Sequence, residues 1–176
     1  GSGKTRVLTH RIAYLIQENV PSESILAVTF TNKAAEEMRE RVKNLLDDNY
    51  KPLPTIGTFH AICLQILRRE IDKLDYQKNF VIYDEADQLS LIKQIIKDLQ
   101  MDIGQIKPSV LRENISRAKD ELIDSQTYQS EANEYWPKIV AKIYGKYQKS
   151  LKKANALDFD DLIMLAVHLF QKYPII

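Results

Sequence analysis

The first five residues of the chain, Gly-Ser-Gly-Lys-Thr, have the residue types and the spacing that bind the phosphates of a nucleotide. They match the second half of the P-loop pattern G-x-x-x-x-G-K-[ST], whose backbone N–H groups wrap the phosphates. Gly3 allows the backbone to approach, Lys4 places a point charge at the β- and γ-phosphates, and Thr5 offers a hydroxyl to Mg²⁺. A glycine-rich turn before a helix is the alternative that involves no ligand. The first glycine of the pattern would stand about five places before Gly3, so we expect a fragment that begins inside a nucleotide site.

Two strand ends carry side chains that suit single-stranded nucleic acid. A short apolar run over 25–30 predicts a buried strand of a parallel sheet, and it ends in Phe30, Thr31 and Asn32 ahead of a helix. The same construction recurs after a strand expected over 55–58, where the residues are Thr58, Phe59 and His60. The aromatic ring would stack on a base, while the hydroxyl, the amide and the helix N-terminus would meet phosphates.

Each of these strand ends also has an interpretation that needs no ligand. Phe30 could belong to the core, and Asn32 could simply cap the next helix. His60 could be a satisfied histidine at a helix start, and no neighbouring histidine or carboxylate has a spacing that suggests a metal site. Two equivalent strand ends in one sheet favour a shared nucleic-acid track more than either end does alone.

An acidic pair follows another apolar run and allows two interpretations. The run over 80–83 ends in Asp84 and Glu85, which has the form of a Walker B, where one carboxylate holds Mg²⁺ and the other orients the attacking water. Alternatively, Asp84 caps a helix over 85–100, and Glu85 and Asp87 complement the macrodipole of that helix. The residues alone leave both interpretations open.

Three further aspartates surround Phe159, and they are Asp158, Asp160 and Asp161. They could bind a cation. More simply, they cap and charge the start of a helix over 159–173, which is the interpretation that we favour.

A stripe of lysines is predicted along one side of a long helix over 134–154. The lysines fall within about 120° of one another at a helical spacing of about 100° per residue. The members of this lysine stripe are Lys138, Lys142, Lys146, Lys149, Lys152 and Lys153. A solvated helix face is one explanation; a surface for a phosphate backbone, centred on Lys142 and Lys146, is the other.

Composition places the chain among globular proteins, with 44% hydrophobic and 28% charged residues in 176. The net charge of +1 gives no overall footprint for nucleic acid, so a basic surface would have to be local. Cys63 is the single cysteine, which rules out an internal disulfide; its apolar neighbours predict a buried core thiol. No signal peptide or membrane-spanning run is present, so a reducing, cytoplasmic setting is expected. The residues do not determine the oligomeric state, for which a monomer is the expectation.

Strands alternate with helices up to about residue 75, which predicts the start of a doubly wound α/β domain with ligands at the C-terminal strand ends. Helical spacing of apolar residues predicts helices over 5–18, 32–47 and 59–71 in this part. From about residue 84 nearly every segment is predicted to be helical. Pro108 marks the start of a helix over 108–119, and a polar stretch over 120–133 is expected to be a loop.

The order of these segments resembles the UvrD/Rep/PcrA-type DNA helicases of superfamily 1 over essentially the whole chain. Four segments carry the resemblance: Gly-Ser-Gly-Lys-Thr-Arg-Val-Leu-Thr, Val-Thr-Phe-Thr-Asn-Lys-Ala-Ala-Glu-Glu-Met, Gly-Thr-Phe-His-Ala and Leu-Asp-Phe-Asp-Asp-Leu. The resemblance implies a partial RecA-like P-loop domain with a parallel sheet over 1–79. It also implies an inserted all-helical subdomain over 80–154 and a return helix over 155–176.

The resemblance also assigns roles by matching position. Gly1, Ser2, Gly3, Lys4, Thr5 and Arg6 are expected to contact ATP, with Lys4 and Thr5 taking part in catalysis and Thr5 binding Mg²⁺. The two strand ends are expected to contact single-stranded DNA. In this family the Asp-Glu pair of the Walker B follows the return helix, so the Walker B interpretation of Asp84 becomes the weaker one.

These expectations describe part of an ATP-dependent 3′→5′ DNA helicase, inactive by itself because the remaining walls of its ATP site lie outside the chain. The polarity follows from the resemblance only. Two alternatives remain. One is a non-catalytic module that binds single-stranded nucleic acid, and the other is a DEAD-box RNA helicase that uses Asp84 and Glu85.

Overall fold

The structure is a computed structural model that describes residues 3–46, 52–101, 104 and 106–176. Its contacts divide the chain into two compact units, Gly1–Ile62 and Cys63–Ile176. Each unit contains its own pair of parallel strands. The units are described separately below.

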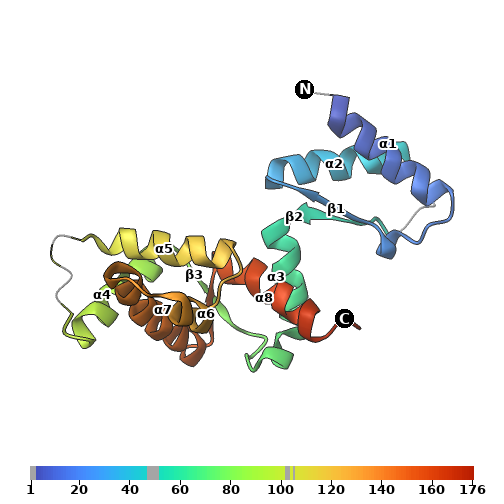
Figure 1. Ribbon diagram of the computed structural model, residues 1–176. Helices are drawn as coiled ribbons and strands as arrows, with labels where there is room; N and C mark the ends of the chain where they lie inside the picture. Colours follow the sequence, from blue (N-terminus) through green and yellow to red (C-terminus); the bar gives the residue numbers. More distant parts are fainter. Residues whose placement is uncertain (1–2, 47–51, 102–103, 105) are drawn as a thin grey trace. The chain divides into compact units, whose positions relative to one another are not determined.

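The first unit is a small α/β arrangement in which helices cover one face of two parallel strands (Figure 1). Strand β1 (Leu26–Thr29) pairs with β2 (Thr55–Thr58), and the register places Leu26 opposite Thr55 and Thr29 opposite Thr58. The helical elements of this unit are α1 (Gly3–Gln17), the short 3₁₀ turn η1 (Ser22–Ser24), α2 (Asn32–Leu45) and the start of α3 (Phe59–Glu70).

Apolar side chains from both helices and both strands form the core of the first unit. The members with the lowest exposure are Val42, Ala35, Met38, Ala13 and Ile16. Leu26 is 58% exposed, so the expectation of a fully buried strand is wrong at this position. The reason is that helices α1 and α2 pack on one face of the two described strands, whereas burial on both faces requires two layers of helices.

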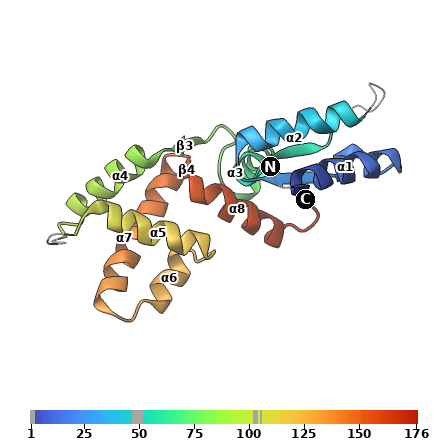
Figure 2. The ribbon, with the colours of Figure 1, turned by 90° about the horizontal axis from the view of Figure 1, so that it is seen from above.

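The second unit is mostly helical and also contains one parallel strand pair. Its elements are the end of α3, η2 (Ile71–Leu74), β3 (Val81–Tyr83), α4 (Glu85–Asp98), α5 (Pro108–Asp120), α6 (Ser125–Glu131), α7 (Tyr135–Lys153), β4 (Ala156–Asp158) and α8 (Phe159–Lys172). Figure 2 shows α4 to α7, here named the α4–α7 bundle, grouped beside the β3–β4 pair, with α8 leading away from it.

Two separate hydrophobic clusters stabilise the second unit. The bundle core joins α4, α5 and α7, and its members with the lowest exposure are Ile92, Leu111, Val140, Ile143, Tyr144, Leu151 and Ala156. The α8 core joins α3, η2, the strands and α8, and its members are Leu67, Ile71, Phe80, Leu157, Leu162 and Leu169. Ala156 belongs to the first cluster and Leu157 to the second, so the boundary between the cores passes through β4.

The chain enters and leaves the α4–α7 bundle at adjacent points. Asn155 follows α7 with a positive φ of 49°. Its side-chain oxygen accepts a hydrogen bond from the backbone N–H of Gln77 at 2.9 Å, and its amide nitrogen donates to the Gln77 carbonyl at 3.3 Å. This pair of bonds holds the segment before β3 against the start of β4.

The helices expected from apolar spacing are present to within two residues at most ends, and the expected mixture of a parallel α/β part and a mostly helical part is confirmed. The part over 80–154 is not entirely helical, because β3 lies at its start and pairs with β4. The expectation of a loop over 120–133 is wrong because α6 lies there. Cys63 is only half-buried, and burial raises the pKa of its thiol. Among the described residues, no helix combines the length and apolar character that crossing a membrane requires. The division at 79 and 154 stays a prediction.

Candidate nucleotide and nucleic-acid site

The start of α1 presents the P-loop residues that the structure describes. Gly1 and Ser2 lie outside the described residues. Gly3 and Lys4 are exposed, and apart from its chain neighbours and the backbone of its own helix, no described atom lies within 4 Å of the position that a Gly3 side chain would occupy. The first turn of α1 contains no acidic residue. The backbone N–H groups at a helix start have no intrahelical partners, and no acidic side chain of this turn competes for them. The residues present therefore fit an anion such as a phosphate.

Arg6 lies one turn further along α1 and lines a hollow of about 330 Å³ between α1 and α2. The other residues that line it are Thr9, His10, Arg41, Asn44 and Leu45. Arg6 is exposed and Thr5 is half-buried. A hollow lined by two arginines on α1 and α2 is compatible with the nucleotide contact expected of Arg6.

The two strand ends with aromatic residues lie side by side in the first unit. Thr29 and Thr58 are direct partners in the parallel ladder, so the residues that follow them emerge at the same edge. Phe30 is 93% exposed and Phe59 is 49% exposed. Their ring centroids lie 6.3 Å apart with an interplanar angle of 54°. The alternative that placed Phe30 in the core is therefore wrong, and the two rings form a solvent-facing pair.

Threonine hydroxyls cap the helices that follow these strands. Thr31 is the N-cap of α2 and accepts a hydrogen bond from the N–H of Ala34 at 3.1 Å. The expectation that Asn32 caps this helix is wrong by one residue, because Asn32 is already its first helical position. Thr58 accepts in the same way from the N–H of Ala61 at 3.2 Å. These caps satisfy an N–H group without adding a negative charge.

The remaining members of this edge are also on the surface. Asn32 and His60 are exposed, and neither α2 nor α3 has an acidic residue in its first turn. Gly57 allows the tight connection, because a side chain there would meet Ile62 at 3.2 Å. The structure thus gathers all six predicted strand-end residues at one edge of the β1–β2 sheet. Two aromatic rings and two helix N-termini without acidic residues can stack on bases and meet phosphates.

Asp84 and Glu85 are engaged within the second unit. Asp84 is the N-cap of α4 and accepts from the N–H of Asp87 at 2.9 Å, while the Asp87 carboxylate accepts from the N–H of Asp84 at 3.2 Å. Glu85 pairs with Arg112 at 3.1 Å. The helix-cap interpretation is confirmed. Strand β3, which precedes Asp84, pairs with β4 among the described strands and not with β1 or β2.

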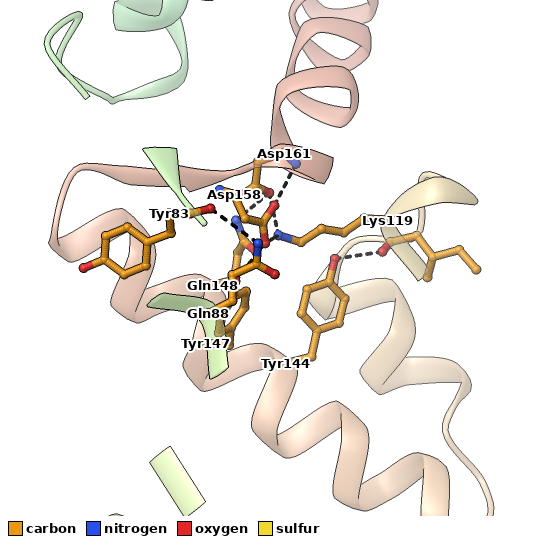
Figure 3. Close-up of polar contacts among 9 residues, drawn as sticks. Tyr83, Gln88, Lys119, Tyr144, Tyr147, Gln148, Asp158 and Asp161 are labelled. Carbon is orange, nitrogen blue, oxygen red and sulfur yellow. Dashed lines mark hydrogen bonds and ion pairs between the residues drawn. The ribbon is translucent and has the colours of Figure 1, made fainter. Parts of the chain in front are cut away.

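Asp158 and Asp161 likewise form a capping box, at the start of α8, which confirms the favoured interpretation of these aspartates. They also bind a cation from the chain itself. The ammonium of Lys119 lies 2.7 Å from the Asp158 carboxylate and 2.8 Å from that of Asp161 (Figure 3). Tyr147 donates its hydroxyl to Asp158 at 2.9 Å, and Gln148 donates its amide to Asp161 at 3.0 Å. We name these five residues the Lys119 junction.

Burial controls the electrostatics of the Lys119 junction. Lys119, Asp158 and Asp161 are each 1% exposed. Burial raises the pKa of Asp161 to about 6, although the ammonium of Lys119 lowers it and the charge of Asp158 adds to the rise. Burial alone would lower the pKa of Lys119, but the two carboxylates outweigh this effect and raise it. Burial thus dominates the pKa of Asp161, whereas the two carboxylates together dominate the pKa of Lys119.

The lysine stripe is exposed along α7, as expected, but one member has partners in the second unit. Lys152 lies 3.3 Å from the Leu74 carbonyl, 3.9 Å from the Asp75 carboxylate and 5.1 Å from the centre of the Tyr76 ring. Lys138 and Lys142 line a groove of about 500 Å³ together with Gln129, Ala132 and Ala141. The other members of the stripe are exposed along the whole length of α7.

Sequence analysis missed Lys119, which it left at the end of a helix without a role. A signal was present, because Leu111, Ile115 and Lys119 recur at four-residue spacing on the buried face of α5. A lysine at a core position requires a buried anionic partner. No group of three or more histidines, cysteines and acidic residues could hold a metal ion within the described ranges.

Comparisons with known proteins support the family resemblance that the sequence segments indicated. A family model described as the UvrD/REP helicase N-terminal domain matches residues 1–176. The chain is 49% identical over 175 residues to a Bacillus subtilis (strain 168) protein named ATP-dependent DNA helicase PcrA, and the match covers 99% of this chain and 24% of that protein. Proteins of the same name from Staphylococcus aureus (strain Mu50) and Staphylococcus epidermidis are each 46% identical, with the same coverage. The chain thus spans about a quarter of the length of these curated relatives.

Proposed function

The chain belongs to the UvrD/REP helicase family, and from this premise we propose that it forms a part of an ATP-dependent DNA helicase that contacts both the nucleotide and one DNA strand. The full-length protein would hydrolyse ATP and convert that reaction into 3′→5′ movement along one DNA strand. The relatives' names support ATP and DNA as its ligands. The chain contributes one wall of the nucleotide site and one section of the strand track.

The observation that carries the proposal is the paired aromatic edge of the β1–β2 sheet. Phe30 and Phe59 expose their rings at neighbouring strand ends, 6.3 Å apart. Stacking on an aromatic ring tolerates any base, which a helicase requires because it must move along every sequence. The hydroxyls of Thr31 and Thr58, with Asn32 and His60 beside them, lie at the adjoining helix starts, where phosphates would bind.

The nucleotide would bind at the start of α1. Gly3 and Lys4 would hold the β- and γ-phosphates, and the hydroxyl of Thr5 would be one ligand of Mg²⁺. Gly1 and Ser2 would complete this part of the turn, with Arg6 next to the nucleotide. When bound, Mg²⁺-ATP supplies the phosphoanhydride bond whose cleavage drives movement. The contribution of this chain is to bind and orient the phosphates with a lysine and free N–H groups.

The lysine stripe would provide a second DNA contact, of a different kind. Lys142 and Lys146 are exposed on α7 and would attract the phosphate backbone without reading bases. Because the net charge of the whole chain is only +1, such a contact depends on this local concentration of lysines.

Replacing Lys4 in the full-length protein tests the proposal. Lys4→Ala should lower DNA-stimulated ATP turnover by at least about 100-fold, because it removes a charge that stabilises the phosphates during reaction. Binding of single-stranded DNA, measured by fluorescence anisotropy, should change by less than about twofold. Arg11→Ala is the matched control, since Arg11 is an exposed cation on the same helix.

Unchanged turnover in Lys4→Ala would end the assignment of the P-loop. A wild-type protein that binds single-stranded DNA and has no DNA-stimulated ATPase would instead be the non-catalytic binding module.

A further inference from the structure

The second unit contains two hydrophobic cores, and a buried polar cluster lies where they meet. Ala118, next to Lys119, belongs to the bundle core, and so does Tyr147. Leu157 and Leu162, the neighbours of Asp158 and Asp161, belong to the α8 core. The Lys119 junction therefore crosses the boundary between the two cores and connects α5 and α7 with β4 and α8 (Figure 3).

Every carboxylate oxygen of the junction has a donor. One oxygen of Asp158 accepts from the N–H of Asp161, and the other accepts from Lys119 and Tyr147. One oxygen of Asp161 accepts from the N–H of Asp158, and the other accepts from Lys119 and Gln148. The excess negative charge lies at the N-terminus of α8, where the helix macrodipole stabilises it.

The geometry of this cluster is more restrictive than apolar packing. Hydrophobic contacts are non-directional and tolerate sliding of one surface over another, whereas charge-assisted hydrogen bonds hold distance and angle. The ammonium is also enclosed, with the ring centres of Tyr147 and Tyr144 lying 5.3 and 5.9 Å from it. Any rotation of α8 against α5 would separate a buried ammonium from buried carboxylates, which is strongly unfavourable.

We propose that Lys119 is a positioning residue that fixes the α4–α7 bundle to β4 and α8, so that load on the lysine stripe is transmitted to α8. This inference rests on the proposed function, because a mechanical connection between the bundle and the rest of the protein has a consequence only in a helicase. Lys119 contacts neither nucleotide nor DNA in this assignment. It acts only through Asp158 and Asp161.

The main test compares ATP consumption with unwinding in the full-length protein. Lys119→Met combined with Asp161→Asn removes one positive and one negative charge, so the net charge of the cluster is retained while the connection is lost. ATP turnover on single-stranded DNA should stay within about twofold of wild type. The number of base pairs unwound per ATP should fall by at least about fivefold, the lower end of an ordinary coupling between two sites.

A structural readout separates positioning from stability alone. Spin labels at cysteines replacing Lys97 on α4 and Gln171 on α8, both exposed, report the distance between the bundle and α8. The distance distribution should broaden in the double variant at a temperature at which circular dichroism shows it folded. Arg117→Met is the control, because it removes an exposed cation from the same helix, and it should leave both readouts unchanged.

Tyr147→Phe provides a milder variant if the double variant does not fold. It removes only the hydroxyl that donates to Asp158. Base pairs unwound per ATP should then fall by about twofold, less than in the double variant, because the bonds of Lys119 to both carboxylates remain. A folded variant of either kind with wild-type unwinding per ATP and a wild-type distance distribution would overturn the proposal. If wild type itself neither hydrolyses ATP nor unwinds DNA, the proposed function fails, while the distance measurement still tests the junction.

Discussion

In the first unit the strands β1 and β2 lead into helices capped by the hydroxyls of Thr31 and Thr58, whereas in the second unit β3 and β4 lead into helices capped by aspartates. Both units use two parallel strands, each followed directly by a helix. The first turns of α2 and α3 contain no acidic residue, while those of α4 and α8 contain two each.

This difference shows that strand-to-helix geometry alone does not define a phosphate site. A hydroxyl cap satisfies one N–H group and leaves the positive end of the helix available to an external anion. An aspartate cap supplies the anion from within the chain and would repel a phosphate. The first unit is therefore suited to binding a DNA backbone at its strand ends, and the second unit uses its strand ends for internal connections.

The largest expected effect comes from removing the aromatic pair. Phe30→Ala combined with Phe59→Ala should weaken single-stranded DNA binding by at least about 30-fold, because stacking contributes about 1–3 kcal/mol per base and two rings are removed. Anisotropy titration of the full-length protein measures this. Phe159→Ala is the matched control, since Phe159 also follows a strand end and is 50% exposed. If Phe159→Ala lowered the affinity for single-stranded DNA as much as the double variant does, the proposed difference between the two units would be wrong.

Changing a cap from hydroxyl to acid tests the electrostatic part of the comparison. Thr31→Asp should retain the cap, with a change in the free energy of unfolding below about 0.5 kcal/mol. It should nevertheless lower the affinity for single-stranded DNA by about tenfold, because the new charge would face a phosphate. Thr55→Asp places the same charge at the opposite end of β2 and serves as the control. Undiminished affinity in Thr31→Asp would exclude a phosphate at this helix start.

The lysine stripe should make DNA binding depend on salt concentration, whereas the aromatic strand ends should not. Lys142→Ala combined with Lys146→Ala should reduce the slope of log affinity against log salt by about one to two. The aromatic variant should leave that slope unchanged. Lys93→Ala combined with Lys97→Ala on α4 removes the same exposed charge elsewhere. A slope that does not respond would make the stripe an ordinary solvated helix face.

The smallest effect is expected at Asp84. Asp84→Asn should keep ATP turnover within about twofold, because asparagine caps a helix as well as aspartate does. A steady-state ATPase assay with single-stranded DNA measures this. A loss of several orders of magnitude would give Asp84 a catalytic role and would revive the alternative of a DEAD-box RNA helicase.

Much of this fold could be predicted from the sequence because apolar spacing determines which helix faces are buried. Helix α6 escaped prediction since none of its residues is buried, which leaves no periodic signal. Thr31 and Asn32 are both good caps, and only the backbone geometry distinguishes them. The exposure of Phe30 depends on which faces of the sheet the helices cover. Phenylalanine usually lies in the core, so the residue type alone does not predict an exposed ring.

The contact between Gln77 and Asn155 has a topological consequence. The two residues stand 78 positions apart and share hydrogen bonds, so the chain leaves and returns at one point. The segment between them is therefore closed like a loop, and it contains the whole α4–α7 bundle together with β3 and Phe80 of the α8 core. Its two ends meet at about the spacing of adjacent strands, roughly 4.8 Å, so a change in the length of the bundle helices would leave the entry and exit points where they are.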